Sequence, residues 1–241
     1  YRPHDPGTYM YHCHVEDIEH VTMGMTGIVF VRAQQNMTGA PGAPIARQGG
    51  NISSPVLGYA YNDGVAVSHP LSTAYDREYP MFLSEIWLEG HWGDAHIQES
   101  HWYNFKADFS LLNGRVYPDT LLPNSPIDLP NSTKALAIQT DEFGDLKTNP
   151  GLERLQYQPH SALITCNAGE RVLLRFANLG FREASMTLAG ITMKVVGRDA
   201  TPMKGRDLTD TSYDTDTLLI GAGESYDAIF TAPAHSGGVG P

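Results

Sequence analysis

The sequence predicts an all-β protein built from β-sandwich domains. Glycine and proline are frequent and widely spread, with 24 and 16 occurrences in 241 residues. Short segments rich in β-branched and aromatic residues recur along the chain between turn-forming residues. No segment of helical length carries apolar residues at a period of 3.6. Many short strands joined by turns favour a β-sandwich over a helical bundle.

The N-terminal part contains two predicted strands. Pro6-Gly7 is a turn signal, and residues 8–14, which follow it, are rich in strand formers. Residues 25–31 form the second predicted strand after an irregular stretch. We interpret the two strands as the last hairpin-like unit of a β domain whose earlier strands are absent from this sequence.

The rest of the chain is predicted to hold a linker and a second β domain. The linker is rich in Gly, Pro, Ser and Asn, which bury little apolar surface. The second domain is expected to contain an Asn113-Gly114 turn and repeated short strands. The strands are expected at residues 78–86, 111–112, 171–177, 191–196, 217–220 and 223–231. The predicted division is therefore residues 1–34, a linker at 35–75, and a second domain at 76–241.

The overall charge excludes some classes of partner. Sixteen basic residues stand against 27 acidic residues, which gives a net charge of −11. A nucleic-acid partner is not expected for such an acidic chain. No apolar run approaches the roughly 18 residues needed to cross a bilayer. The chain starts at Tyr1 without an initiator Met or a signal peptide, so we interpret it as a mature or partial chain.

The two cysteines, Cys13 and Cys166, lie far apart in the sequence. A disulfide between them is the less favoured alternative, because Cys13 has a better explanation as a metal ligand. Cys166 ends the apolar, strand-like segment 161–166. We expect it to be an inert, buried thiol.

One cluster carries the residue types of a metal centre. Side chains alternate across a strand, so His12 and His14 are expected on one face and Cys13 on the other. His20 and Met25 follow on the irregular stretch, where the backbone can curl back toward Cys13. Cysteine, histidine and a weak methionine are the ligands of a blue-copper electron-transfer site. A zinc site and a purely structural role are the less favoured alternatives.

This pattern matches a known family. The matching residues are His12-Cys13-His14, His20, Gly24-Met25 and the lead-in at residues 6–11. They resemble the copper signature of multicopper oxidases, laccases among them. The resemblance implies cupredoxin-like Greek-key β-sandwich domains, namely the end of one domain and most of a second. It implies that Cys13 and His20 bind type 1 copper, with Met25 as the axial ligand. It also implies that His12 and His14 each bind one copper of the type 3 pair in a trinuclear centre.

The sequence departs from the commoner laccase pattern at one point. Five residues separate His14 from His20, where three are more usual in the family. The inserted acidic residues, Glu16, Asp17 and Glu19, are expected to be solvated loop charges. A supporting or proton-relay role near the metal is the alternative.

The resemblance continues downstream but without copper ligands. Segments 111–115, 168–178 and 218–227 resemble the second cupredoxin domain of these enzymes. The place where a His-x-His pair would stand is residues 184–190, and it contains no histidine. The second domain is therefore expected to bind no copper and to act as a structural spacer. The blue copper would then lie in an early domain.

A histidine-rich segment contains His91, His96 and His101 at five-residue intervals. That spacing matches neither one face of a helix nor one face of a strand. We interpret the segment as a polar loop packed by Trp92 and Trp102. Binding of a substrate or an extra metal is the alternative.

By resemblance, the expected activity is that of a copper-dependent, laccase-like oxidoreductase. It would oxidise phenols, aromatic amines or metal ions one electron at a time and reduce dioxygen to water. Cys13, His12 and His14 would carry the electron transfer and the oxygen chemistry. The remaining trinuclear ligands would come from residues outside this chain, in further domains or a homo-oligomer. An extracellular or periplasmic location is expected.

Two other functions share part of this ligand set. A blue-copper electron-transfer protein needs no flanking histidines, so His12 and His14 argue against it. A copper nitrite reductase keeps a histidine before the ligand cysteine but gives His14 no role. The number of copper ions bound per site separates the three functions.

Overall fold

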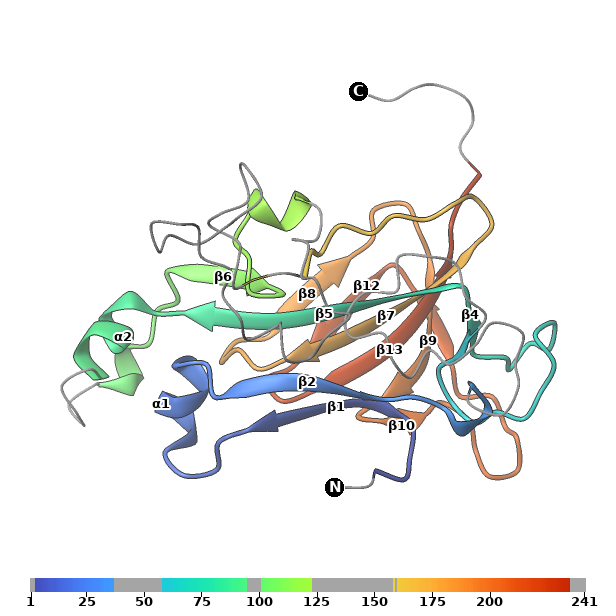
Figure 1. Cartoon of the computed structure of the whole chain (residues 1–241), viewed down its shortest axis with the longest axis horizontal. Helices are drawn as coiled ribbons and strands as arrows, with labels where there is room; N and C mark the ends of the chain where they lie inside the picture. Colours follow the sequence, from blue (N-terminus) through green and yellow to red (C-terminus); the bar gives the residue numbers. More distant parts are fainter. Residues whose placement is uncertain (1–2, 37–57, 95–100, 123–157, 159, 235–241) are drawn as a thin grey trace, which may run out of the picture.

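The computed structural model describes residues 3–36, 58–94, 101–122, 158 and 160–234 (Figure 1). The strands are β1 (Gly7–His12), β2 (Thr26–Val31), β3 (Gly58–Tyr59), β4 (Ala74–Tyr75), β5 (Arg77–Ile86), β6 (Phe109–Leu112), β7 (Arg171–Asn178), β8 (Ala184–Thr187), β9 (Met193–Arg198), β10 (Thr201–Pro202), β11 (Tyr213–Thr215), β12 (Thr217–Ile220) and β13 (Ser225–Thr231). The helices are short: α1 (Asp17–Thr22), α2 (Leu88–Asp94) and the 3-10 turns η1 (Gln34–Asn36), η3 (Trp102–Asn104) and η4 (Asp119–Leu121). None of the helices described is long and apolar enough to cross a membrane. The all-β prediction is confirmed.

A central sheet organises the molecule. Its strand order is β10-β9-β13-β7-β5-β6, and β11 also pairs with β9. The pairing of β5 with β7 is parallel, whereas the other pairings are antiparallel. Three separate two-stranded pairs, β1–β2, β8–β12 and β3–β4, complete the architecture. The β1–β2 hairpin lies along β13 and β7, as Figure 1 shows in blue beside the warm-coloured strands.

The predicted turn at Asn113-Gly114 has the expected geometry. Both residues have positive φ, 54° and 77°, which is typical of a type I′ hairpin turn. The Asn113 side chain also donates to the carbonyls of Pro80 and Ser161, at 2.8 and 3.1 Å. The turn residue therefore fastens β6 to its neighbours as well as reversing the chain.

Alternate residues of β7 serve the two faces of the central sheet, as expected for a strand buried on both sides. Val172, Leu174 and Phe176 belong to the main apolar cluster. Leu173 belongs to a second, smaller apolar cluster, and Arg175 is fully buried among charged groups. The first face is covered by β8 and β12, which contribute Met186, Leu218 and Ile220, and the second by the hairpin and residues 58–75.

The face toward the hairpin carries an ionic cluster, which comprises Arg32, Glu78, Arg175 and Asp227. Glu78 is fully buried and accepts hydrogen bonds from Arg32 and from Arg175. Arg175 also donates to Asp227 at 3.2 Å and to Thr8 at 3.3 Å. Each buried charge therefore has an oppositely charged partner, which offsets the cost of removing it from water.

The ionic cluster joins the hairpin to the central sheet. Thr8 in β1 donates to Asp227 at 2.5 Å, and Tyr61 donates to the other Asp227 oxygen at 2.5 Å. The Arg175 guanidinium lies 5.3 Å from the centre of the Phe30 ring in β2. Both strands of the hairpin are therefore held by charged residues of the central sheet.

The structure describes Cys166 and part of the predicted linker. Cys166 is exposed and residues 161–166 form no strand, so the expectation of a buried strand thiol is wrong. Ala162 and Ile164 pack on the main apolar cluster, while the last residues of that segment face solvent. Within the predicted linker, residues 58–75 form β3 and β4 and bury Tyr61 and Tyr75. Linker residues 37–57 lie outside the described residues, and the division into domains stays a prediction.

Candidate metal centre

The candidate ligands lie where β1 passes into β2. The hairpin pairs His12 with Thr26, so residues 13–25 form its connection. β1 ends at His12, so only the first residue of the His12-Cys13-His14 motif lies in the strand. The connection contains α1 and reverses at Glu16 and Gly24, which have φ of 54° and 97°. A positive φ suits glycine and is unusual for glutamate, so the chain is tightly constrained there.

Cys13 and His20 come together in this connection. The Cys13 sulfur lies 3.0 Å from His20 Nδ1, and the backbone N–H of Val15 donates to the sulfur at 3.4 Å. The hydrogen bond from Val15 and the one with His20 lower the pKa of the Cys13 thiol below its ordinary value. The same contact with Cys13 raises the pKa of His20. The Cys13 thiol also donates to the Val15 carbonyl at 2.9 Å, so the sulfur lies between this carbonyl and an imidazole nitrogen.

Met25 is tied to both of these residues through its backbone. Its N–H donates to the His20 carbonyl at 2.8 Å, and its carbonyl accepts from the Cys13 N–H at 3.1 Å. The Met25 side chain is exposed. The loop thus brings the backbone of the third candidate ligand next to the first two.

His12 and His14 lie together and apart from the Cys13–His20 contact. Their rings stack with centres 6.1 Å apart and planes 22° apart. His12 Nδ1 lies 2.7 Å from the Cys13 carbonyl oxygen. Both residues are exposed, so their outer ring nitrogens are available to a partner.

Two of the three acidic residues in the connection have side-chain partners. Glu16 lies 3.9 Å from His20 Nε2, one helical turn away. Glu19 accepts a hydrogen bond from the indole N–H of Trp102 at 3.3 Å. Asp17 stands in the first turn of α1, where a negative charge is favourable. The interpretation of all three as solvated loop charges is therefore wrong for Glu19.

The donor types of these contacts can be compared with those that copper takes. A sulfur with a lowered pKa facing an imidazole nitrogen, with a methionine adjoining, matches the softer ligands of a blue-copper site. In the described part of the chain, no group of three or more His, Cys, Asp or Glu is arranged to hold a metal. The residues present therefore supply donor types that copper takes, and the described residues alone do not complete a metal site.

The histidine-rich segment is only partly described. His101 is exposed and lies against Tyr103, with ring centres 5.4 Å apart. His91 lies in α2, and its Nε2 is buried with no hydrogen-bond partner among the described residues. His96 lies outside the described residues. The sequence pattern did not reveal the partner of Trp102, because no local signal links it to Glu19, 83 residues earlier.

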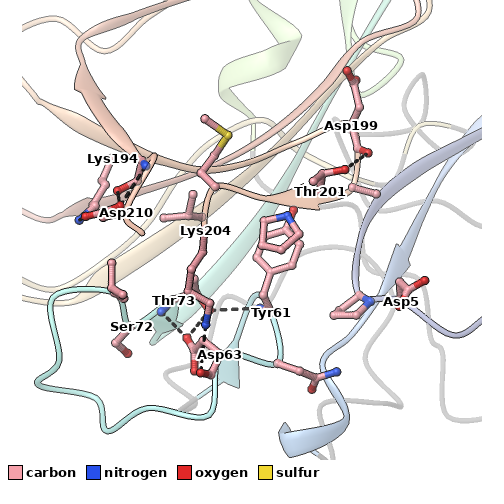
Figure 2. Close-up of a pocket in the computed structure, with 18 of the residues that line it drawn as sticks. Asp5, Tyr61, Asp63, Ser72, Thr73, Lys194, Asp199, Thr201, Lys204 and Asp210 are labelled. Carbon is pink, nitrogen blue, oxygen red and sulfur yellow. Dashed lines mark hydrogen bonds and ion pairs between the residues drawn. The ribbon is translucent and has the colours of Figure 1, made fainter. Parts of the chain in front are cut away.

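A separate cavity of about 460 Å³ lies away from the candidate ligands. Figure 2 shows Tyr61, Asp63, Thr73 and Lys204 gathered at this cavity. Asp63 accepts from the Thr73 N–H and hydroxyl, and Lys204 donates to the Asp63 carbonyl at 3.1 Å. None of the five candidate copper ligands lines it.

The chain is similar to multicopper oxidases in both sequence and structure. Sequence profiles described as multicopper oxidase match residues 78–238 and residues 1–35. No curated protein matches the chain. The blue copper oxidase from Nitrosomonas europaea is similar in structure, with a TM-score of 0.53 and 20% identity over 97% of this chain and 48% of that one.

Two further solved structures show the same likeness. The multicopper oxidase mgLAC has a TM-score of 0.50 and 20% identity over 95% of this chain and 46% of its own. The copper nitrite reductase from Nitrosomonas europaea has a TM-score of 0.50 and 19% identity over 95% of this chain and 54% of its own. This chain thus spans about half the length of these proteins, and the likeness shows a cupredoxin-like fold. Because the first profile covers well over half of its residues, the chain belongs to the multicopper oxidase family.

Proposed function

We propose that this chain carries the type 1 copper segment of a laccase-like oxidase. The proposal rests on one observation, the 3.0 Å contact between the Cys13 sulfur and His20 Nδ1. In this proposal Cys13 and His20 are ligands and Met25 is the weak axial ligand. A second histidine ligand comes from outside the described residues. Copper bound there supplies one-electron redox chemistry.

The residues of the chain prepare the site in three ways. The Val15 N–H and His20 favour the thiolate form of Cys13, which is the form that binds a metal. Nδ1 of His20 lies 3.0 Å from the sulfur, so the loop brings the two donors to one place. The backbone bonds of Met25 to Cys13 and His20 keep the loop closed around them.

The flanking histidines extend the proposal toward oxygen chemistry. Peptide bonds connect Cys13 directly to His12 and His14, which gives electrons a short covalent route away from the sulfur. We assign these two histidines to the type 3 copper pair. Further domains or a homo-oligomer would supply the remaining ligands of the trinuclear cluster, where dioxygen is reduced to water.

The reducing substrate is proposed by class. Small phenols, aromatic amines or metal ions would donate electrons near His20, whose side chain is more than one-third exposed. An exposed imidazole edge gives a small donor access without deep entry into the protein. An extracellular or periplasmic location belongs to the same proposal.

The first test replaces the sulfur. In the intact, copper-loaded protein, Cys13→Ser should abolish the strong blue absorption expected for a thiolate–copper bond. The matched control is Cys166→Ser, because Cys166 is the other cysteine and is exposed. This control should keep the full absorption. A Cys13→Ser protein that stayed blue would refute the assignment.

Copper counting separates the alternatives. The oxidase should bind four copper ions per complete set of sites, a nitrite reductase two and an electron carrier one. His14→Ala should reduce the count in the oxidase without removing the blue colour. An unchanged count in His14→Ala would favour the electron carrier or the reductase.

A further inference from the structure

A hydrogen bond links the candidate copper loop, residues 13–25, to the turn η3. The indole Nε1 of Trp102 donates to Glu19 Oε1 at 3.3 Å. Glu19 lies in α1, immediately before the candidate ligand His20. Trp102 lies in η3, which follows β5 and α2 of the region that carries no copper ligands. Trp102, from the region without copper ligands, therefore holds helix α1, which carries the candidate ligand His20.

Trp102 is itself held in an aromatic cluster, which comprises Trp87, Trp102, Phe105 and Phe181. The Trp102 ring lies 5.4 Å from that of Trp87 and 6.0 Å from that of Phe181. Phe105 packs against Phe181 at 4.7 Å and against Trp87 at 5.7 Å. Trp87 is buried, so the cluster is anchored in the fold rather than on the surface. The direction of the indole N–H is therefore fixed by packing.

Helix α1 needs such an external contact. It has six residues, too few to be stable alone, and its N-cap residue Glu16 makes no capping hydrogen bond. Ile18 on this helix is exposed and Val21 is only half-buried, so apolar burial holds the helix only in part. The hydrogen bond from Trp102 holds the side chain of Glu19, the residue next to His20, in place.

We propose that Trp102 is a positioning residue for His20. Through Glu19 it sets the orientation of α1 and hence the angle at which His20 meets Cys13. This inference rests on the proposed function. Residues 76–241 were expected to act as a structural spacer. With this role for Trp102, they would also influence the geometry of the copper site.

The test removes the N–H and keeps the ring. Trp102→Phe, in the intact copper-loaded protein, should shift the position of the blue absorption band and the midpoint potential of the copper. In the metal-free protein, amide hydrogen exchange in α1 should become about three- to tenfold faster, as expected for the loss of one typical intramolecular hydrogen bond. The matched control is Trp92→Phe, since Trp92 lies in α2 and is 82% exposed. It should change neither quantity.

A second set of variants leaves the aromatic cluster intact. Glu19→Leu removes the acceptor, so it should reproduce the faster exchange of Trp102→Phe. Adding Trp102→Phe to Glu19→Leu should then have no further effect. Glu19→Gln keeps an acceptor oxygen and should retain most of the exchange protection.

The two proposals fail in different ways. A blue Trp102→Phe protein with unchanged band, potential and α1 exchange would overturn the positioning role alone. A change in exchange without any change in band or potential would also overturn it, because the bond would then only dock the helix. A wild-type protein without the blue band would overturn the proposed function, and this inference with it.

Discussion

The two faces of the central sheet are built from the same strands but from opposite chemistry. One face presents Val172, Leu174 and Phe176 to the apolar cluster under β8 and β12. The other presents Arg175, with Glu78 and Asp227 from the neighbouring strands, to the hairpin that carries the candidate ligands. The first contact buries hydrocarbon, and the second buries ions together with the smaller apolar cluster around Leu173 and Tyr75.

This difference suggests that the two faces have different roles in the fold. Apolar contacts tolerate small shifts, because the hydrophobic effect has no direction. Buried ion pairs are directional and are costly when one partner is lost. Burial would raise the pKa of Glu78, but Arg175 and Arg32 lower it, so the carboxylate stays ionised. We infer that the ionic cluster fixes where the hairpin docks, while the apolar face supplies most of the stability.

The largest expected effect comes from removing the central cation. Arg175→Ala leaves the buried carboxylates of Glu78 and Asp227 without their shared partner, and should lower the free energy of unfolding by about 4 kcal/mol. Urea denaturation measures this change. Hydrogen exchange should show the β1–β2 hairpin loosening before the central sheet. A loss below about 1 kcal/mol would mean that water solvates the carboxylates left without Arg175. The two faces would then not differ in how they hold the hairpin.

Next in size is a truncation on the apolar face. Leu174→Ala, one residue from Arg175, should lower the free energy of unfolding by about 3 kcal/mol, through lost burial and a cavity. The same denaturation experiment measures it. In contrast to Arg175→Ala, exchange in the hairpin should follow global unfolding. If hydrogen exchange in Leu174→Ala became faster in the hairpin before the central sheet, the proposed difference between the two faces would be contradicted.

The smallest effect concerns a charge at the rim of the apolar face. Hydrogen bonds from Arg77 and from the Asn167 backbone lower the pKa of Glu170 from 4.5 to about 2. A lowered pKa stabilises the fold above pH 4.5, and this contribution is lost as the pH falls toward 2. Glu170→Gln should therefore be less stable than wild type at pH 7, and the two proteins should converge near pH 2. Thermal unfolding across this range measures the difference. A gap that persisted at pH 2 would show that Glu170 acts by packing instead of charge.

The strands could be predicted from the sequence because strand and turn patterns involve neighbouring residues. The segment 217–220 was predicted as a strand and is β12, and the Asn113-Gly114 turn was predicted from two adjacent residues. Cys166 was misplaced because apolar composition does not say which residues of an extended segment face the core. The polar face was also missed, since Glu78 and Arg175 meet only when β5 and β7 pair in parallel.

By itself, the sequence determined the all-β class, the family and the identity of the candidate ligands, since alternation, turn residues and ligand spacing are properties of neighbouring positions. Only the tertiary structure decided that Cys13 meets His20, that the charges of one sheet face hold the hairpin, and that Trp102 reaches Glu19. The last two contacts join residues far apart in the chain, and the first depends on how the connection folds back. Their geometry is therefore fixed by packing, which no local pattern encodes.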